Sequence, residues 1–158
     1  MTHWEVRMKI YIAGKITGDP DYKKKFADAE TALVSKGHSV MNPAWQNEGK
    51  EFNYADYMLV SEAMQKICNA IVLLDDWKES AGATLEHHRA ILRCQKIYHG
   101  VDEVPDYNKR CYVVCNAEES FALSRNECME FLKVSDDDLT RIIENGAAKR
   151  GYTVDVMD

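Results

Sequence analysis

Two segments of the chain carry residues that together could do chemistry on a sugar. Ile10–Gly18 has the pattern of a buried strand that runs into a glycine loop, and Ser80–His87 has that of a turn opening a helix with one carboxylate, Glu86. In an open α/β sheet, ligands bind where such loops gather, outside the carboxyl ends of the strands. We therefore expect the loop N–H groups and Glu86 to face one pocket. A carboxylate in that position suits nucleophilic cleavage of a bond at a sugar carbon.

Glu86 carries the most specific chemical hypothesis. Cleavage of an N-glycosidic bond passes through an oxocarbenium-like state, which a carboxylate captures covalently or shields while water attacks. A helix N-terminus favours the ionised form of a carboxylate, so we expect Glu86 to be charged. The alternative is that Glu86 is an ordinary acidic residue near the start of a helix.

Residues after the expected third strand, and one tryptophan in an earlier loop, could serve a leaving base. Asp75 and Asp76 follow the apolar run that ends at Leu74, and either could supply a proton or a hydrogen bond to the base. Trp77 and Trp45 could stack on it. The alternatives are a solvated strand end for the two aspartates and simple packing for the two tryptophans.

The glycine loop itself is a candidate for binding a phosphate or a sugar. Gly14, Thr17 and Gly18 could turn backbone N–H groups toward the ligand. Lys15 could add a positive charge beside a 5′-phosphate, or it could simply be exposed to solvent. Glycine turns after strands are common, so the loop alone does not identify a ligand.

The sequence predicts neither a metal site nor a cofactor. His87 and His88 directly follow Glu86, but adjacent residues on a helix do not share a face. Cys111 and Cys115 have no His or Cys partners at the spacing of zinc ligands.

The order of the expected elements predicts the fold. Strands alternate with helices, and the run Ala70–Leu74 is apolar throughout, as in a central parallel strand covered on both faces. This pattern predicts a flavodoxin- or Rossmann-like parallel sheet with helices on both faces in residues 1–100. We expect strands over 7–13, 38–41, 70–74 and 96–99, and helices over 19–37, 53–67 and 82–94, the first capped by Asp19 and buried through Phe26, Ala29, Leu33 and Val34.

Residues 101–110 are expected to form a linker, and 111–158 a small helical module. Ser124–Glu127 is a capping box, and Ser135–Asp138 is a close variant of one. Each should open a short helix, with Lys133-Val134 as the tight connection between them. Two short helices joined this way are helix-turn-helix-like. Residues 151–154 could close the unit as a strand.

Charge and composition restrict the partners and the compartment. The net charge is −6, and residues 101–158, with 7 basic and 13 acidic side chains, account for all of it. Because phosphate contacts require Lys and Arg, binding of nucleic acid is not expected. No apolar run reaches the roughly 20 residues of a membrane span. Five cysteines without framework spacing favour a reduced, cytoplasmic protein.

Four motifs occur in order along residues 8–99, namely Met8–Gly14, Ile16-Thr17-Gly18, Asn42-Pro43 and the run Ser80-x-Gly82-x-x-x-Glu86. Through these motifs, the segment resembles the nucleoside 2-deoxyribosyltransferase-like superfamily, especially its small phage and bacterial branch. The resemblance implies a flavodoxin- or Rossmann-like sheet and cleavage of the N-glycosidic bond of deoxynucleosides or nucleoside 5′-monophosphates. It also implies that Glu86 is the nucleophile and that Tyr11 orients it. With the loop and tryptophan hypotheses, the expected substrate-binding residues are Gly14, Lys15, Thr17, Gly18, Asn42, Trp45, Trp77, Ser80 and Gly82.

One departure from the superfamily leaves a second function open. Its active families usually carry an aspartate at a position that is Ser61 here. The leading expectation is an enzyme that cleaves the N-glycosidic bond or transfers the deoxyribosyl group. The alternative is a non-catalytic nucleotide-binding or sensing protein of the same fold.

The stretch from Ser124 to Leu139 is followed by Lys149-Arg150-Gly151-Tyr152. Through these two segments, residues 111–155 more weakly resemble a helix-turn-helix module of phage and homing-endonuclease proteins. Such modules usually bind DNA, which implies a DNA-associated adaptor as a third possibility. Asp136, Asp137 and Asp138 stand where such a module makes its base and phosphate contacts. Three carboxylates there would repel a phosphate backbone, which counts against this third possibility.

Self-association is expected as well, because proteins of the transferase-like superfamily commonly complete their pockets at a subunit interface. The second helix carries more large apolar groups than one face needs, namely Tyr54, Tyr57, Met58 and Met64.

Overall fold

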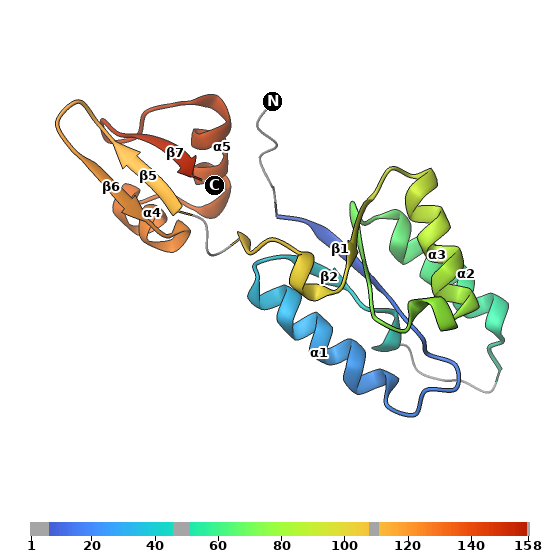
Figure 1. The fold of residues 1–158 in the computed structure, drawn as a ribbon. Coiled ribbons are helices and arrows are strands. Elements are labelled where there is room, and N and C mark those ends of the chain that lie inside the picture. The colour runs from blue at the N-terminus through green and yellow to red at the C-terminus, as the bar shows by residue number, and fades with distance from the viewer. Residues whose placement is uncertain (1–6, 46–50, 108–110, 158) are drawn as a thin grey trace. The chain divides into compact units, whose positions relative to one another are not determined.

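The computed structural model describes residues 7–45, 51–107 and 111–157, and the side chains of Trp45 and Cys111 lie outside the description. The chain divides into two compact units, Met1–Tyr107 and Asn108–Asp158. Figure 1 shows both units, and each is described by itself below.

The first unit is built on a four-stranded parallel sheet in the order β2-β1-β3-β4. β1 and β3 are the central strands, and their side chains are almost completely buried, as expected for a parallel sheet covered on both faces. The elements are β1 (Lys9–Ala13), α1 (Tyr22–Ser35), β2 (Ser39–Met41), α2 (Tyr54–Lys66), β3 (Ala70–Leu73), α3 (Ala81–Leu92) and β4 (Lys96–His99), with short 3-10 turns η1 (Pro43–Trp45), η2 (Trp77–Glu79) and η3 (Val101–Glu103).

Alternation along the central strands creates two hydrophobic layers. Ile10 and Ile12 of β1 pack with Phe26 and Leu33 of α1. Tyr11, with Ala13, belongs to the opposite layer, which includes residues of α2 and α3. The expected doubly covered parallel sheet is therefore confirmed (Figure 1). The period of two along β1 is what sends Tyr11 toward α3.

The first helix differs in detail from the sequence expectation. It begins at Tyr22 with Asp21 at the N-cap, so Asp19 does not cap it. Asp19 instead accepts a hydrogen bond from the Asp21 N–H and pairs with Lys25. Val34 was expected on the buried face but is 54% exposed, because the buried face is Phe26, Ala29 and Leu33 alone.

The segment after β4 belongs to the first unit as far as Tyr107. Most of the linker expected at 101–110 therefore packs against that unit. Lys36 donates to the carbonyls of Val101 and Val104, and Val104 is buried in the α1 layer. His38 bonds to the Pro105 carbonyl and also accepts from the Met8 N–H. These contacts hold the segment against α1 and β1.

The second unit has a sheet as well as helices. The two expected helices are present, and a three-stranded antiparallel sheet in the order β6-β5-β7 accompanies them, of which only the strand near residues 151–154 was expected. The elements are β5 (Cys111–Cys115), β6 (Ser120–Leu123), α4 (Arg125–Leu132), α5 (Asp136–Asn145) and β7 (Thr153–Met157). Both expected N-caps, Ser124 and Ser135, are present. The core combines helix and strand residues: Tyr112, Val114, Cys128, Leu132, Leu139, Ile142 and Val154.

Candidate functional site

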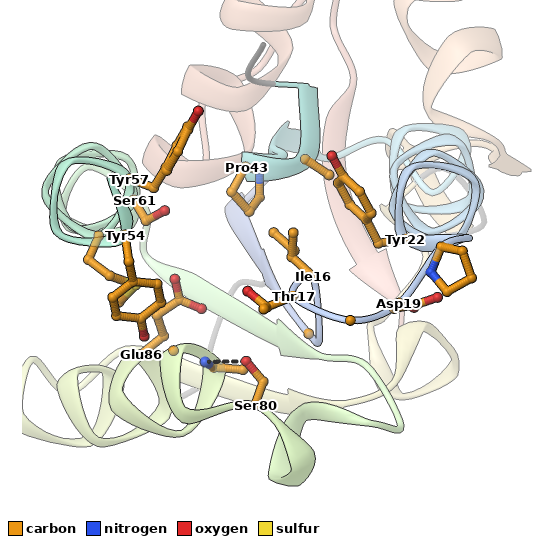
Figure 2. A pocket seen from close by; sticks show the side chains of 17 residues that line it. Ile16, Thr17, Asp19, Tyr22, Pro43, Tyr54, Tyr57, Ser61, Ser80 and Glu86 are labelled. Atoms are coloured by element: carbon orange, nitrogen blue, oxygen red, sulfur yellow. Dashed lines mark hydrogen bonds between the residues drawn. The ribbon is translucent and has the colours of Figure 1, made fainter. Parts of the chain in front are cut away.

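A pocket of about 620 Å³ lies in the first unit, lined by the glycine loop after β1, α2 and the start of α3 (Figure 2). This is the position at which open α/β sheets bind their ligands. Its volume falls in the range of pockets for small organic molecules. The lining residues are Gly14, Ile16, Thr17, Gly18, Asp19, Pro20, Tyr22, Pro43, Ala44, Tyr54, Tyr57, Met58, Ser61, Ser80, Gly82, Ala83 and Glu86.

Glu86 lies in this pocket and is held by Tyr11. The Tyr11 hydroxyl donates a hydrogen bond of 2.6 Å to Glu86 Oε1. The Ser80 side chain accepts from the Ala83 N–H and thereby fixes the first turn of α3, while the Gln65 amide donates to the Glu86 carbonyl at 2.7 Å. The expected proximity of Glu86, Tyr11 and the glycine loop is confirmed.

Burial controls the protonation of this pair. Glu86 is only 6% exposed, and burial raises its pKa to about 7, against the opposing effects of the Tyr11 hydrogen bond and the charge of Arg89. Burial, together with the negative charge of Glu86, raises the pKa of Tyr11 well above its ordinary value, so the phenol keeps its proton. The expectation that the start of the helix keeps Glu86 ionised is wrong. Glu86 lies in the second turn of α3, where desolvation outweighs the helix dipole.

Ser61 also lines the pocket, from α2. It is 7% exposed, and its hydroxyl interacts with the Tyr11 phenol and opposes the rise of the Tyr11 pKa. The position at which the resembled families carry an aspartate therefore faces the Tyr11–Glu86 pair. A carboxylate at Ser61 would lie close to Glu86, and each would raise the pKa of the other.

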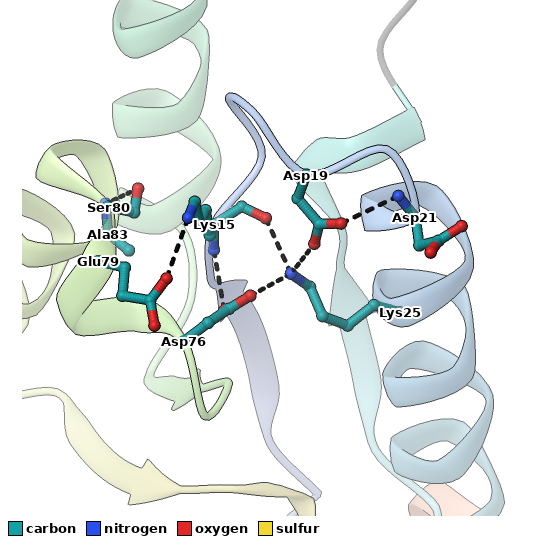
Figure 3. Close-up of polar contacts among 8 residues, drawn as sticks. All are labelled: Lys15, Asp19, Asp21, Lys25, Asp76, Glu79, Ser80 and Ala83. Atoms are coloured by element: carbon teal, nitrogen blue, oxygen red, sulfur yellow. Dashed lines mark hydrogen bonds and ion pairs between the residues drawn. The ribbon is translucent and has the colours of Figure 1, made fainter.

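Charged side chains that do not line the pocket, chiefly Lys25 and Asp76, hold the glycine loop in place (Figure 3). Lys25 donates to Asp19, to Asp76 and to the Lys15 carbonyl at 2.9 Å. The Lys15 N–H donates to Asp76 Oδ1 at 3.1 Å, and the Lys15 ammonium pairs with Glu79 at 3.0 Å. At Gly14, a Cβ would lie 3.0 Å from the Leu74 side chain, so a larger residue there would require Leu74 to shift.

Six of the expected site residues line the pocket. They are Gly14, Thr17, Gly18, Ser80, Gly82 and Glu86, and Tyr11 donates a hydrogen bond to Glu86. The six come from two segments, the loop that follows β1 and the start of α3, which follows β3.

Asp75 and Asp76 do not line the pocket, contrary to the expectation that one of them assists a leaving base. Asp75 is exposed to solvent. Asp76 is bound to Lys25 and to the Lys15 N–H, so its role is to hold the glycine loop. The carboxyl end of β3 thus supplies a structural anchor where the sequence suggested an acid.

Four of the expected binding residues lie elsewhere or outside the description. Lys15 is paired with Glu79, and Trp77 packs against His87 with ring centroids 4.5 Å apart. Asn42 is 5% exposed, where it donates to Glu30 and accepts from the Ala44 N–H, so it shapes the turn after β2. The Trp45 side chain lies outside the described residues.

The aromatic lining was missed as a binding feature. Tyr54, Tyr57 and Met58 were expected at a subunit interface, but they line the pocket from α2, and Tyr22 lines it from α1. Met64 is buried in the layer between α2 and the sheet. The helical spacing of Tyr54, Met58 and Ser61 was the available signal, because it places all three near one helix face.

The described residues contain no group of three or more His, Cys, Asp or Glu side chains that could hold a metal ion. In the same parts of the chain, no helix combines the length and apolar character that a bilayer crossing demands.

Most of the first unit matches a known sequence family. Residues 8–98 match the model of the family described as Domain of unknown function (DUF4406). The chain belongs to this family. The DUF4406 match covers the parallel sheet and all the pocket-lining residues, and it leaves the second unit outside. No curated protein matches the chain.

Proposed function

We propose that the protein cleaves the N-glycosidic bond of a nucleoside or nucleotide, with Glu86 as nucleophile. The observation that carries the proposal is the buried Tyr11–Glu86 hydrogen bond of 2.6 Å beside a pocket of about 620 Å³. No Lys or Arg among the described residues forms an ion pair with Glu86. Its carboxylate therefore remains available for a ligand.

In the proposed reaction, an oxygen of the ionised Glu86 forms a bond to the anomeric carbon as the bond from that carbon to the base breaks. The base leaves with the bonding electrons and takes a proton from solvent. Water then attacks the anomeric carbon of the glycosyl ester in hydrolysis, or a second base attacks it in transfer, and Glu86 is released. Tyr11 stays protonated and orients the reacting carboxylate.

The lining of the pocket supports this substrate class. Tyr22, Tyr54 and Tyr57 present aromatic rings from α1 and α2, which suits the flat face of a nucleobase (Figure 2). Thr17 and Ser61 present hydroxyls, which suit a sugar. The likeness to the nucleoside 2-deoxyribosyltransferase-like superfamily supports the same class, and its small phage and bacterial branch is the proposed placement.

The test is a screen of deoxynucleosides and their monophosphates for release of free base, with Glu86→Gln as the decisive variant. The amide keeps the shape of the side chain but is a poor nucleophile, so base release should fall by about 10³-fold or more while ligand-induced thermal stabilisation persists. Glu130→Gln, an exposed change on α4, is the matched control and should leave turnover unchanged. Unchanged turnover in Glu86→Gln would remove Glu86 from the mechanism.

The second candidate is a non-catalytic nucleotide-binding or sensing protein, and Ser61 is the observation that favours it. Ser61 lies beside Tyr11 and Glu86, where active relatives carry an aspartate. Under the enzymatic proposal, Ser61→Asp raises weak base release. If both the unmodified protein and Ser61→Asp bind deoxynucleosides but neither releases base, the sensor is favoured.

We also propose self-association and a reduced, cytoplasmic location. Large apolar side chains are exposed on the outer surfaces of α2 and α3, at Leu59, Val60, Leu85, Ile91 and Leu92. A second copy covering this surface gives a dimer, which light scattering across the micromolar range detects; a monomer throughout contradicts it. Cys68, Cys94, Cys115 and Cys128 are unpaired, as in a reducing compartment, and cell fractionation tests the location.

A further inference from the structure

The charges around the pocket are unfavourable for an anionic ligand. Two carboxylates, Asp19 and Glu86, line it, and none of its lining residues in the described parts of the chain is Lys, Arg or His. A phosphate would therefore approach two acidic groups without a cation on the pocket wall.

The nearest lysines are already used. An ammonium group has three donors, and Lys25 spends them on Asp19, Asp76 and the Lys15 carbonyl (Figure 3). The Lys15 ammonium pairs with Glu79. Burial lowers the pKa of Lys25, but the contacts with Asp19 and Asp76 outweigh it and raise that pKa overall. The Lys25 ammonium therefore stays charged and paired.

Two backbone donors of the glycine loop and two at the start of α3 are also engaged. The Lys15 N–H donates to Asp76, and the Asp19 N–H donates to the Ile16 carbonyl at 3.2 Å. At the start of α3, the Ala83 N–H donates to Ser80 Oγ and the Thr84 N–H to the Ser80 carbonyl. A glycine loop that binds phosphate instead leaves such N–H groups pointing at the ligand.

Building on the proposed function, we infer that the pocket accepts the uncharged nucleoside and discriminates against its 5′-monophosphate. Asp19 is the residue that sets this preference. Its carboxylate accepts from the Asp21 N–H and from Lys25, and an ionised carboxylate has about four acceptor sites. The remaining sites suit a hydroxyl donor of the sugar and repel a phosphate.

The experiment measures binding of matched pairs, each deoxynucleoside against its 5′-monophosphate, to the Glu86→Gln protein by calorimetry. This variant prevents turnover, so binding is read separately from chemistry. The nucleoside should bind about tenfold or more tightly than the monophosphate, and the ratio should grow as salt is lowered, because electrostatic repulsion is then less screened.

A second substitution in that background tests Asp19 itself. Asp19→Asn removes one carboxylate from the pocket and releases one donor of Lys25, so the preference for the nucleoside should shrink several-fold. Asp28→Asn changes the net charge equally but affects only an exposed pair with Lys24 on α1, and it should leave the ratio unchanged.

The outcomes separate the two claims. Equal or tighter binding of the monophosphate overturns the inference and leaves the proposed function standing. An unchanged ratio in Asp19→Asn overturns the role of Asp19 and with it the inference. Binding of neither ligand class overturns the proposed function, and the inference falls with it.

Discussion

The two units differ in how they treat a buried charge. Each buries one Asp, Glu, Lys or Arg side chain in its described part, Glu86 in the first unit at 6% exposure and Arg125 in the second at 4%. Arg125 pairs with Asp136 at 2.7 Å, donates to Thr140 at 2.6 Å and to the Asp136 carbonyl, and lies over the ring of Tyr112. Glu86 has one hydroxyl donor and an open cavity.

This contrast separates a structural charge from a candidate functional one. Burying a charge costs free energy unless partners compensate for it, and Arg125 has enough partners to join α4 to α5. None of the Lys or Arg residues that the structure describes pairs with Glu86, and the cost of burial appears as its raised pKa. A poorly compensated carboxyl group beside a cavity is a better guide to function than burial alone.

The largest effect should come from removing the structural charge. Arg125→Met removes the ion pair with Asp136 and the hydrogen bond to Thr140, so the second unit should lose about 3 kcal/mol of stability, reduced from the fully buried case because Asp136 is 35% exposed. Hydrogen exchange of amides in α4 and α5 measures the loss. Arg141→Met, which affects an exposed contact with Asp138, should change little. Equal effects of the two substitutions would contradict the structural role of Arg125.

Removing the buried carboxyl group of Glu86 should raise the stability of the protein, the opposite of the effect of removing Arg125. Burial raises the pKa of Glu86 to about 7, so its contribution to stability is fully present below about pH 4.5 and is lost as the pH rises through 7. Glu86→Gln should therefore be more stable than the unmodified protein at pH 9, by about 3 kcal/mol at most, and the difference should vanish near pH 4. Thermal unfolding at both pH values measures it. A pH-independent difference would mean that Glu86 does not titrate near 7.

A smaller effect is expected on the rate of base release. If the ionised form of Glu86 attacks, the rate should rise about tenfold between pH 6 and pH 8, following ionisation near 7. Tyr11→Phe removes the hydrogen bond that lowers the Glu86 pKa. In this variant, the rise of the rate with pH should therefore occur at higher pH. A rate that falls over this range would indicate that the protonated carboxyl is the active form.

The smallest effect is expected for DNA. Arg125, the first residue of α4, is spent inside the second unit, and Asp137 and Asp138 remain at the start of α5. Phosphate contacts supply most non-specific affinity, so the full chain should show no micromolar binding to duplex DNA at about 100 mM salt. Salt-sensitive micromolar binding in a titration would revive the adaptor interpretation.

Local patterns predicted the sheet of the first unit and the segments that carry the site, whereas the pairing of Tyr11 with Glu86 was implied by the resemblance to the transferase-like superfamily. Strand alternation determines the side to which Tyr11 points, and the Ser80 cap determines where α3 begins and hence where Glu86 lies. The protonation of Glu86 could not be read in the same way, because it depends on how many groups from other elements surround the carboxyl.

The predictions that failed concern residues whose contacts come from elements far away in the sequence. Asp76 follows a strand end in either interpretation, but only the fold brings Lys25 of α1 to it. Asn42 similarly meets Glu30 of the same helix. In the second unit, Cys111–Cys115 was weighed for metal ligands, and its strand was missed because its pairing with β7 joins residues far apart in sequence.

The strand order β2-β1-β3-β4 has a consequence for synthesis. β1 can pair with β2 as soon as α1 has formed between them, but its other edge waits for β3, since Ile10 pairs with Ala70. At about 5–20 residues per second, translation leaves that apolar edge open for several seconds. An unpaired strand edge is a template for association with other chains. The nascent chain is therefore most vulnerable to aggregation before β3 has emerged from the ribosome.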